Sequence, residues 1–363
     1  MRNERVSETE LVESAVTFLR DRLPEGWNLT INSQGQAIGN SRLRPDAILM
    51  LTAPDGATAA LVVEAKETVD PRNVSRVLDQ LNLHKEQLPP PPSASGILVA
   101  PFLGPRTRQL LKSGACGFVD STGNAWLALS SPALFLETTG AMKDPKPPPE
   151  RPLLSLKGQA AGRAVRAICD FSPPFKLRDL ARRARVSPPT LSRVLTLLDR
   201  EALVDRDRKG TVINSDWQGT IRRWTEDYAF STSNRVRMFL DPRGIDAFKS
   251  KLSSLTRTYA ATGSLVASRI EPIAPPRLAQ VFVENINAAA ESLDLKEVEK
   301  GANVMLAEPF APVVFDRVSN RKGLICAALT QVAADLLTSP GRAPEEAERL
   351  LIWMENNTDA WRQ

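Results

Sequence analysis

Two acidic residues and a lysine in the first third of the chain have the types and spacing needed for metal-dependent chemistry. Asp46 opens one apolar run, Glu64 closes another, and Lys66 follows the glutamate by two positions. An aspartate beside a glutamate on adjacent strands can hold Mg²⁺, because this cation takes a few carboxylates together with waters and phosphate oxygens. A lysine two positions along points to the same face of a strand and could position or help activate a water for attack on a phosphodiester. The alternative is a strand edge that bears ordinary solvated charges.

The patterning of the first third predicts an α/β domain that would position these side chains. Apolar residues at helical spacing predict helices, and short apolar runs predict buried strands. The order of helix, three strands, helix and strand is an α/β plan, in which Asp46 begins the second strand and Glu64 and Lys66 end the third. The expected elements are a helix at 8–23, strands at 27–31, 46–51 and 59–65, a helix around 74–81, a proline-rich loop at 89–92 and a strand at 97–100.

The dipeptide Pro-Asp at 45–46, followed by Glu-Ala-Lys at 64–66, resembles the motif of the PD-(D/E)XK nuclease superfamily, and the order of elements agrees with that family's core. The resemblance implies a restriction-endonuclease-like domain. In it Asp46 and Glu64 would be the Mg²⁺ ligands and Lys66 the water-activating lysine. A nuclease fold kept for DNA contact, with weak or no cleavage, would have the same signature.

The same resemblance adds positions on two helices. Gln80 lies on the helix after the lysine, where related nucleases often have a glutamine, and it joins the candidate catalytic residues. His84 follows four residues later, where a tyrosine is common, so this part of the match is imperfect. The upstream helix of the family often adds a glutamate, for which Glu10 and Glu13 are the candidates.

Residues 163–214 have the pattern of a winged helix-turn-helix, a DNA-reading module. An apolar face over 175–181 predicts one helix, and Pro188 can open the next, because proline is tolerated in the first turn of a helix. That second helix, extending to Arg200, has an apolar face of its own. Two β-capable runs around a charged turn that ends at Gly210 predict the wing.

The charge distribution supports this interpretation. Residues 151–223 contain sixteen Lys or Arg and seven Asp or Glu, whereas the whole chain has a net charge of +5, so the rest of the chain is slightly acidic. A concentrated basic excess is typical of a surface that binds DNA phosphates. The alternatives are a helical bundle with a solvated basic face and a winged helix used for protein contacts.

Two sets of DNA contacts are expected from the predicted module. Exposed side chains on the second helix would reach base edges of double-stranded DNA, and arginines and lysines around them would contact phosphates. A homodimer is a further expectation, because helix-turn-helix regulators commonly read paired half-sites. The expected base contacts are Thr190, Ser192 and Arg193, and the expected phosphate contacts are Arg182, Arg183, Arg206, Arg208 and Lys209.

The last third of the chain mixes expected strands and helices. A helix from Trp217 to Phe230 would connect it to the wing. Apolar triplets predict two strands, and longer periodic segments predict two helices. The strands are expected at 281–283 and 313–315, and the helices at 324–337 and 344–354.

Three phrases in this region resemble the C-terminal domain of the AbiEi antitoxin regulators: YAATGSLVA at 259–267, DLLTSPGR at 335–342 and PEEAERLL at 344–351. With the winged helix, the resemblance covers residues 163–363. It implies a repressor that binds operator DNA and whose partner toxin is a nucleotidyltransferase. The phrase FVDSTGN at 118–124 resembles a turn in the same proteins, although a purely structural hairpin is the favoured interpretation.

Nucleotidyltransfer by this chain itself is not expected. Gly263 and Ser264 suit such an enzyme, which also needs two carboxylates at alternate positions on the next strand to hold metal. The strand at 281–284 offers Glu284 alone. The C-terminal domain is therefore expected to support dimerisation or DNA contact.

The chain as a whole limits the remaining possibilities. Its 363 residues suggest two or three domains, and its 42% apolar and 25% charged residues are ordinary for a globular protein. Three widely spaced cysteines argue against a disulfide framework or zinc site, and a single histidine against most histidine-based centres. The charged N-terminus and lack of a long apolar run predict a cytoplasmic protein.

Together these patterns predict an α/β multidomain protein with a restriction-endonuclease-like αβ domain, a central winged helix-turn-helix and a C-terminal α+β domain. The leading hypothesis is a DNA-binding regulator of the AbiEi type. The alternative is a Mg²⁺-dependent DNA nuclease that the winged helix targets, and a third is an assembly protein. The expected boundaries are 1–140 for the nuclease-like domain, 141–155 for a proline-rich linker, 156–215 for the winged helix and 216–363 for the C-terminal domain.

Overall fold

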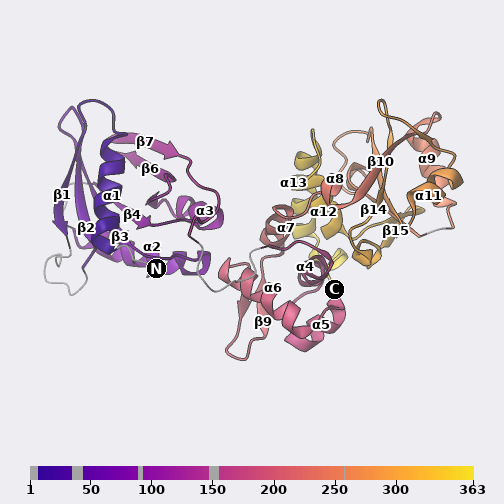
Figure 1. Ribbon diagram of the computed structural model, residues 1–363, viewed down its shortest axis with the longest axis horizontal. Coiled ribbons are helices and arrows are strands. Elements are labelled where there is room, and N and C mark those ends of the chain that lie inside the picture. Colours follow the sequence, from indigo (N-terminus) through magenta and orange to yellow (C-terminus); the bar gives the residue numbers. More distant parts are fainter. Residues whose placement is uncertain (1–6, 35–43, 89–92, 147–154, 257) are drawn as a thin grey trace. The chain divides into compact units, whose positions relative to one another are not determined.

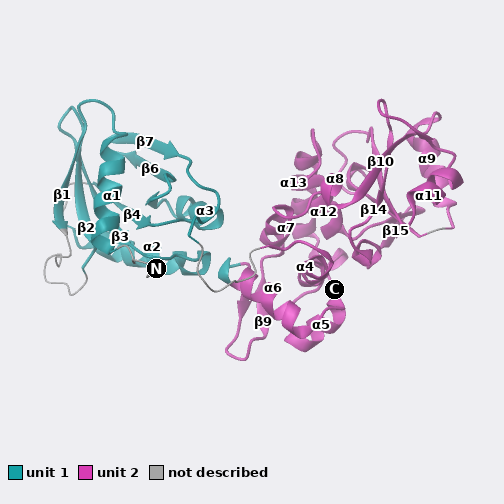
Figure 2. Cartoon of the chain, in the orientation of Figure 1, with its two compact units in different colours: residues 1–150, 200–202 teal, residues 151–199, 203–363 magenta. Residues whose placement is uncertain are grey.

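The computed structural model describes residues 7–34, 44–88, 93–146, 155–256 and 258–363. The proline-rich loop at 89–92 and the linker residues 147–154 lie outside the described residues. The chain forms two compact units, residues 1–150 with 200–202 and residues 151–199 with 203–363 (Figure 2). Each unit is described by itself.

Unit 1 is built on one seven-stranded sheet whose strands lie side by side in chain order. The first three strands pair antiparallel, β3, β4 and β5 pair parallel, and the last three pair antiparallel again. Parallel neighbours need a crossover connection, and a helix supplies each of the two. The strands are β1 (Asn28–Gln34), β2 (Ala47–Thr52), β3 (Thr58–Ala65), β4 (Ser93–Ala100), β5 (Gly117–Asp120), β6 (Ala125–Ser130) and β7 (Ala133–Thr138).

Helices cover both faces of this sheet (Figure 1). Helix α1 (Glu8–Arg20) packs on one face, and α2 (Val74–Glu86) and α3 (Pro105–Ser113) pack on the other. Strand β3 is buried from both sides, so its side chains alternate between the two cores: Val63 faces α1, and Val62 faces α2. This three-layer arrangement has the helices and strands expected from the sequence up to residue 100.

The buried polar side chains of the hairpin at 118–124 are hydrogen-bonded within the fold. The buried Asp120 carboxylate accepts hydrogen bonds from the backbone N–H groups of Thr122 at 2.9 Å and Leu103 at 3.0 Å. Asn124, also buried, donates to the same carboxylate at 2.9 Å. Since its polar groups are occupied by the fold, the turn has a structural explanation.

Unit 2 begins with three helices and a two-stranded hairpin. Phe175, expected in a helix, instead pairs with Val212 across an isolated bridge beside the hairpin. Arg185 adopts a left-handed conformation after the second helix, and the Ser187 hydroxyl accepts the N–H of Thr190 at 3.3 Å at the start of the third. The elements are α4 (Gln159–Asp170), α5 (Leu177–Ala184), α6 (Pro188–Arg200), β8 (Val204–Arg206) and β9 (Val212–Ser215).

A second seven-stranded sheet forms the rest of unit 2, in the order β13-β10-β14-β12-β11-β16-β15. Its pairings are both parallel and antiparallel. The strands are β10 (Arg235–Leu240), β11 (Tyr259–Thr262), β12 (Ala279–Val283), β13 (Lys296–Glu297), β14 (Val304–Glu308), β15 (Ser319–Arg321) and β16 (Leu324–Cys326). The helices are α7 (Trp217–Thr225), α8 (Phe230–Ser233), α9 (Gly244–Ser253), α10 (Ser264–Ala267), α11 (Ile286–Ser292), α12 (Leu329–Leu337) and α13 (Ala343–Asn356).

Three expectations for this region were wrong. The segment expected as a strand at 313–315 is a 3₁₀ helix, Pro312–Phe315, opened by its proline. The helix expected from 324 begins at Leu329, because the preceding residues form β16 after a turn at Gly323 with φ of +80°. The connecting helix from Trp217 stops at Thr225, and a separate short helix starts at Phe230.

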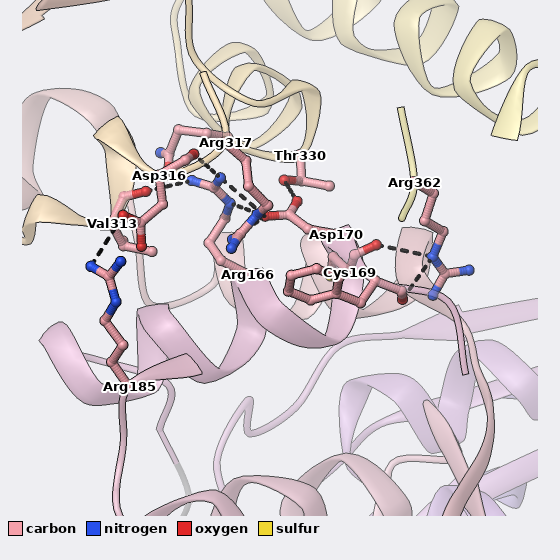
Figure 3. Close-up of polar contacts among 11 residues, drawn as sticks. Arg166, Cys169, Asp170, Arg185, Val313, Asp316, Arg317, Thr330 and Arg362 are labelled. Atoms are coloured by element: carbon pink, nitrogen blue, oxygen red, sulfur yellow. Dashed lines mark hydrogen bonds and ion pairs between the residues drawn. The ribbon is translucent and has the colours of Figure 1, made fainter. Parts of the chain in front are cut away.

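A buried arginine joins the first helix of unit 2 to the C-terminal part of that unit (Figure 3). Arg166 on α4 is 0% exposed and pairs with Asp170 at 3.1 Å. It also donates to the carbonyl of Val313 at 3.3 Å and to Gln331 at 3.1 Å. Asp170 also forms an ion pair with Arg317 and accepts a hydrogen bond from the Thr330 hydroxyl. Segments far apart in the sequence are therefore held in one polar network.

A second buried network connects the AbiEi-like phrases. Asp335 on α12 accepts hydrogen bonds from the hydroxyls of Tyr228 at 2.6 Å and Thr262 at 2.5 Å, and from Gln331 at 2.9 Å. Thr262 belongs to the first phrase and Asp335 to the second. Two of the three phrases thus contribute a residue to one buried network.

The Asp335 network predicts a pH-dependent stability. Burial raises the pKa of Asp335 to about 6 from 3.8, although Thr262, Tyr228 and Gln331 donate to it. Between these pH values the unfolded chain releases a proton that the folded chain keeps, so this group's contribution to stability falls as pH rises. We expect a loss of roughly 3 kcal/mol across the window. Urea unfolding from pH 3.5 to 7 gives the free energy of unfolding of the wild type and of Asp335→Asn, and the difference between them should change with pH by this amount. If the two free energies changed in parallel with pH, the expectation would be wrong.

Two expectations from composition concern the chain as a whole. The three cysteines, Cys116, Cys169 and Cys326, are free and buried. No helix in the described part of the chain combines the length and apolar character needed to cross a membrane.

Candidate active site

The pairing of β2 with β3 brings Asp46 and Glu64 to the same end of the two strands. The antiparallel ladder ends with the pair Ala47 and Val63, so Asp46 and Glu64 are the residues that follow at this end of the two strands. The backbone N–H of Asp46 donates to the carbonyl of Val63 at 3.0 Å. The Asp46 carboxylate accepts the N–H of Ala65 at 2.6 Å. Backbone pairing and a side-chain hydrogen bond therefore both fix the aspartate at the end of β3.

Lys66 brings the two carboxylates together. Its Nζ donates to Glu64 Oε2 at 2.7 Å and lies 3.9 Å from Asp46 Oδ2. The backbone N–H of Lys66 donates to the carbonyl of Val99 on β4 at 2.9 Å, which extends the pairing of β3 past its last residue. The structure thus gathers the three side chains that the sequence selected.

Access to this cluster is unequal. The Glu64 side chain is 1% exposed, whereas those of Asp46 and Lys66 are 22% and 32% exposed. Burial lowers the pKa of Lys66, but the hydrogen bond and charge of Glu64, with the charges of Asp46 and Glu8, raise it overall. Lys66 is therefore an ammonium at neutral pH. In that form it can orient a water or stabilise negative charge, and it cannot accept a proton.

His84 is the residue that sequence reasoning did not assign to the site. Its Nε2 lies 2.9 Å from Glu64 Oε1, and both side chains are 1% exposed. The two side chains therefore contact each other directly in the core of unit 1. The available signal was its spacing: His84 follows the buried Val77 and Leu81 on the face of α2 that packs on the sheet.

The other residues suggested by the nuclease resemblance lie differently. Gln80 is half-buried one turn before His84, and no hydrogen bond within the described ranges joins it to the carboxylates or the lysine. Glu10 accepts the backbone N–H of Ser7 at 2.7 Å in the cap of α1, and Glu13 is exposed. The glutamate of α1 whose charge acts on Lys66 is instead Glu8.

The donor set fits a cation that needs few protein ligands. Across the described parts of the chain, no three carboxylate, imidazole or thiol groups converge on one point as a metal site. Mg²⁺ is commonly held by one or two carboxylates, with waters and substrate phosphates completing its shell. Asp46 and Glu64 supply two carboxylates at adjacent strand ends, and Lys66 lies near both of them. These two carboxylates would hold the ion.

The residues expected to contact DNA bases lie on α6 of unit 2. Arg193 is exposed, and Thr190 and Ser192 are partly exposed. The Thr190 hydroxyl contacts the Ser187 hydroxyl at 2.9 Å, so part of its hydrogen-bonding capacity serves the start of the helix. Arg193 is the most accessible of the three.

The residues expected to contact phosphates differ in their exposure and in their partners. Arg208 and Lys209 are exposed in the hairpin turn. Arg182 pairs with Asp179 at 3.2 Å but stays 80% exposed. Arg206 differs from expectation, because it pairs with Asp199 at 2.9 Å and is 26% exposed. Arg183, which is exposed, lies over the ring of Phe171 at 4.7 Å.

The fold and this geometry define an α/β unit whose central sheet carries two carboxylates and a lysine at adjacent strand ends. No protein-family model matches the chain, and no curated protein matches it. The AbiEi resemblance therefore has no support from these comparisons.

Two solved structures are similar to part of the chain. One is a repair endonuclease from Pyrococcus abyssi, with 21% identity over 33% of this chain and 49% of that chain and a TM-score of 0.23. The other is EndoMS in its apo form, with 20% identity, 33% and 48% coverage and a TM-score of 0.21. The chain thus spans about half the length of each. TM-scores this low do not establish a common fold, so the function proposed below rests on the site.

Proposed function

We propose that the protein is a metal-dependent DNA nuclease whose reaction takes place at Asp46, Glu64 and Lys66. The observation that carries the proposal is the position of one ammonium nitrogen, 2.7 Å from Glu64 and 3.9 Å from Asp46. A solvated strand edge does not account for this cluster, because the side chain of Glu64 is 1% exposed and is held by Lys66 and His84.

The chemistry follows from the three side chains. A divalent cation held by Asp46 and Glu64 would supply a Lewis acid for a phosphodiester oxygen. Lys66, charged and partly exposed, would hold a water beside the phosphate and stabilise the negative charge that develops on it. The backbone hydrogen bonds of Asp46 and Lys66 keep both groups in place, which lowers the cost of orienting them.

DNA would be delivered by the segment 156–215, which we propose to be a winged helix. Its support is the order of α4, α5, α6 and the β8–β9 hairpin, the exposed Arg193, and the basic turn at 207–210. The same module would serve an AbiEi-type regulator with a nucleotidyltransferase toxin partner or a homodimeric repressor. The carboxylate–lysine cluster favours the nuclease, since a repressor has no need of it.

The test is cleavage by the full chain. Plasmid and single-stranded DNA are incubated with the protein and Mg²⁺, Mn²⁺ or EDTA, beside Asp46→Asn and a control, Asp55→Asn, in the exposed turn between β2 and β3. We expect cutting that needs the metal, disappears in Asp46→Asn and persists in Asp55→Asn. Cutting that survives in Asp46→Asn would assign it to another site, and no cutting on any substrate would favour the regulator.

The hairpin turn gives a second prediction. Replacing Arg208 and Lys209 by alanine should weaken binding to all duplex sequences, because phosphate contacts carry no sequence information. If both side chains contact phosphates, the log–log salt slope should shrink by about 1.8. Gel-shift titrations at several salt concentrations measure it. The control, Lys296→Ala with Lys300→Ala, removes the same charge from exposed positions elsewhere in unit 2 and should leave the slope unchanged; equal slopes in all three proteins would reject the assignment.

A further inference from the structure

A histidine interrupts the apolar face that α2 turns towards the sheet. The buried residues of this face are Val74, Val77, Leu81 and His84, at the three- and four-residue spacing of one side of a helix. Val77 and Leu81 pack in the apolar core on this side of the sheet, whereas His84 Nε2 lies 2.9 Å from Glu64 Oε1. A polar side chain at a core position needs a partner, since leaving a buried polar group unpaired costs free energy.

The direction of the Glu64 side chain explains why its partner comes from α2. Val62 belongs to the apolar core between the sheet and α2, and side chains two positions apart along a strand point to the same face. Glu64 therefore points towards α2, into surroundings that are otherwise apolar. An apolar residue in place of His84 would leave Glu64 Oε1 buried without a polar group to meet it, which is unfavourable.

The Glu64 carboxylate is held at both of its oxygens. Oε1 meets His84 Nε2 at 2.9 Å, and Oε2 accepts the ammonium of Lys66 at 2.7 Å. A carboxylate held in this way cannot turn about its last bond without losing one of the two contacts. The position of the ammonium, 3.9 Å from Asp46 Oδ2, therefore depends on the contact that His84 makes on the far side of Glu64.

We propose that His84 is a positioning residue, which acts through Glu64 to hold Lys66 at the reacting phosphate. The inference rests on the proposed nuclease function and adds to it a residue from α2. Because the His84 side chain is 1% exposed, it acts through Glu64 and not by contact with DNA. Its loss should slow the chemical step and leave DNA binding unchanged, since a misplaced charge at the reacting centre lowers the rate. A histidine that only fills the core would affect stability alone.

Single-turnover cleavage at saturating DNA separates positioning from core packing. His84→Leu should lower the rate by about 10- to 100-fold and leave the Kd for duplex DNA unchanged. His84→Gln should recover part of the rate, because its amide N–H can donate to Glu64 Oε1. The matched control, Val77→Ala, removes buried volume from the same face of α2; it should lower stability and keep the wild-type rate. Circular dichroism confirms that each variant is folded.

The composition of the chain allows a readout that needs neither cleavage nor a substitution of His84, because His84 is its single histidine. Tag-free full-length protein is labelled with ¹⁵N-histidine, and its imidazole nitrogens are observed by NMR. We expect a proton on Nε2, the nitrogen that faces the carboxylate. Its signal should shift in Lys66→Met, which removes the other partner of Glu64. It should stay in place in Lys112→Met, whose lysine pairs with Glu137 outside the site.

Each outcome decides the inference. An Nε2 without a proton, or a signal that does not respond to Lys66→Met, overturns it. A His84→Leu rate equal to that of Val77→Ala overturns it as well, and the nuclease proposal then stands if the wild type cleaves. If the wild type cleaves no DNA, the nuclease proposal fails. A protonated Nε2 that responds to Lys66→Met then still supports His84 as the residue that holds Lys66 through Glu64.

Discussion

Replacing Lys66 by methionine should lower the single-turnover rate of DNA cleavage by at least about 100-fold, the usual loss when one preorganised charge at a reacting centre is removed. Methionine keeps much of the lysine stem but cannot hold a water or stabilise charge on the phosphate. It also leaves Glu64 Oε2 without its donor at 2.7 Å. Lys66→Arg should recover only part of the rate, because a planar guanidinium cannot occupy the position of a point charge between two carboxylates.

A measurement of DNA binding shows whether the Lys66→Met variant has lost only the chemical step or also its folded structure. We expect the affinity of Lys66→Met for duplex DNA to stay close to that of the wild type, because the proposed delivery surface lies in unit 2. The control is Lys112→Met, which removes a lysine of unit 1 that is paired with Glu137 outside the site. It should cleave at the wild-type rate. A Lys66→Met rate within a few-fold of wild type would remove the lysine from the mechanism.

The sequence predicted part of the site because strand geometry is simple. Side chains repeat every two residues along a strand, so Glu64 and Lys66 had to share a face, and the expected adjacency of two strands put Asp46 beside them. The contact of His84 with Glu64 depends on which face of α2 packs against β3 and on how far along the strand that helix lies. Neither follows from local spacing. The same holds for α1, where the cap occupies Glu10 and leaves Glu8 to act on Lys66.

Short apolar runs explain the main errors in the fold. The triplet 313–315 and the segment from Leu324 are each apolar, and such runs do not distinguish a strand from a buried helix by periodicity. Tertiary context decided both cases. Pro312 opens a 3₁₀ turn in the first, and pairing with β15 draws Leu324–Cys326 into the sheet in the second. Long periodic segments such as α1, α6 and α13 were predicted within a few residues.

The polar groups of unit 2 were harder to interpret, because the sequence does not tell a solvated basic face from a buried arginine. Arg166 lies in the segment whose excess charge indicated DNA binding, yet it is 0% exposed and holds α4 to residues more than 140 positions away (Figure 3). Arg206 likewise forms an ion pair with Asp199. The exposed basic surface of this segment is therefore smaller than the composition suggested, because Arg166 is buried and Arg206 is largely covered.

Arg166→Leu should destabilise the protein by about 3 kcal/mol, at the lower end of the range for breaking a buried ion pair. The substitution removes the arginine donor from Gln331 and from the Val313 carbonyl, which keeps the N–H of Asp316 at 3.0 Å, and it removes the ion pair between Arg166 and Asp170. Arg317, 19% exposed, still pairs with Asp170, which keeps the loss from being larger. Urea denaturation followed by circular dichroism measures it.

Arg185→Leu is the matched control. Arg185 also belongs to this part of unit 2 (Figure 3), where it lies 3.6 Å from Asp316, but its side chain is 70% exposed. Exposed pairs contribute at most about 1 kcal/mol, so this variant should unfold close to the wild type. If both variants lost the same stability, burial would not be the reason for the effect. If Arg166→Leu lost none, Arg317 and Thr330 would be sufficient to satisfy Asp170, and α4 would be held by its apolar contacts alone.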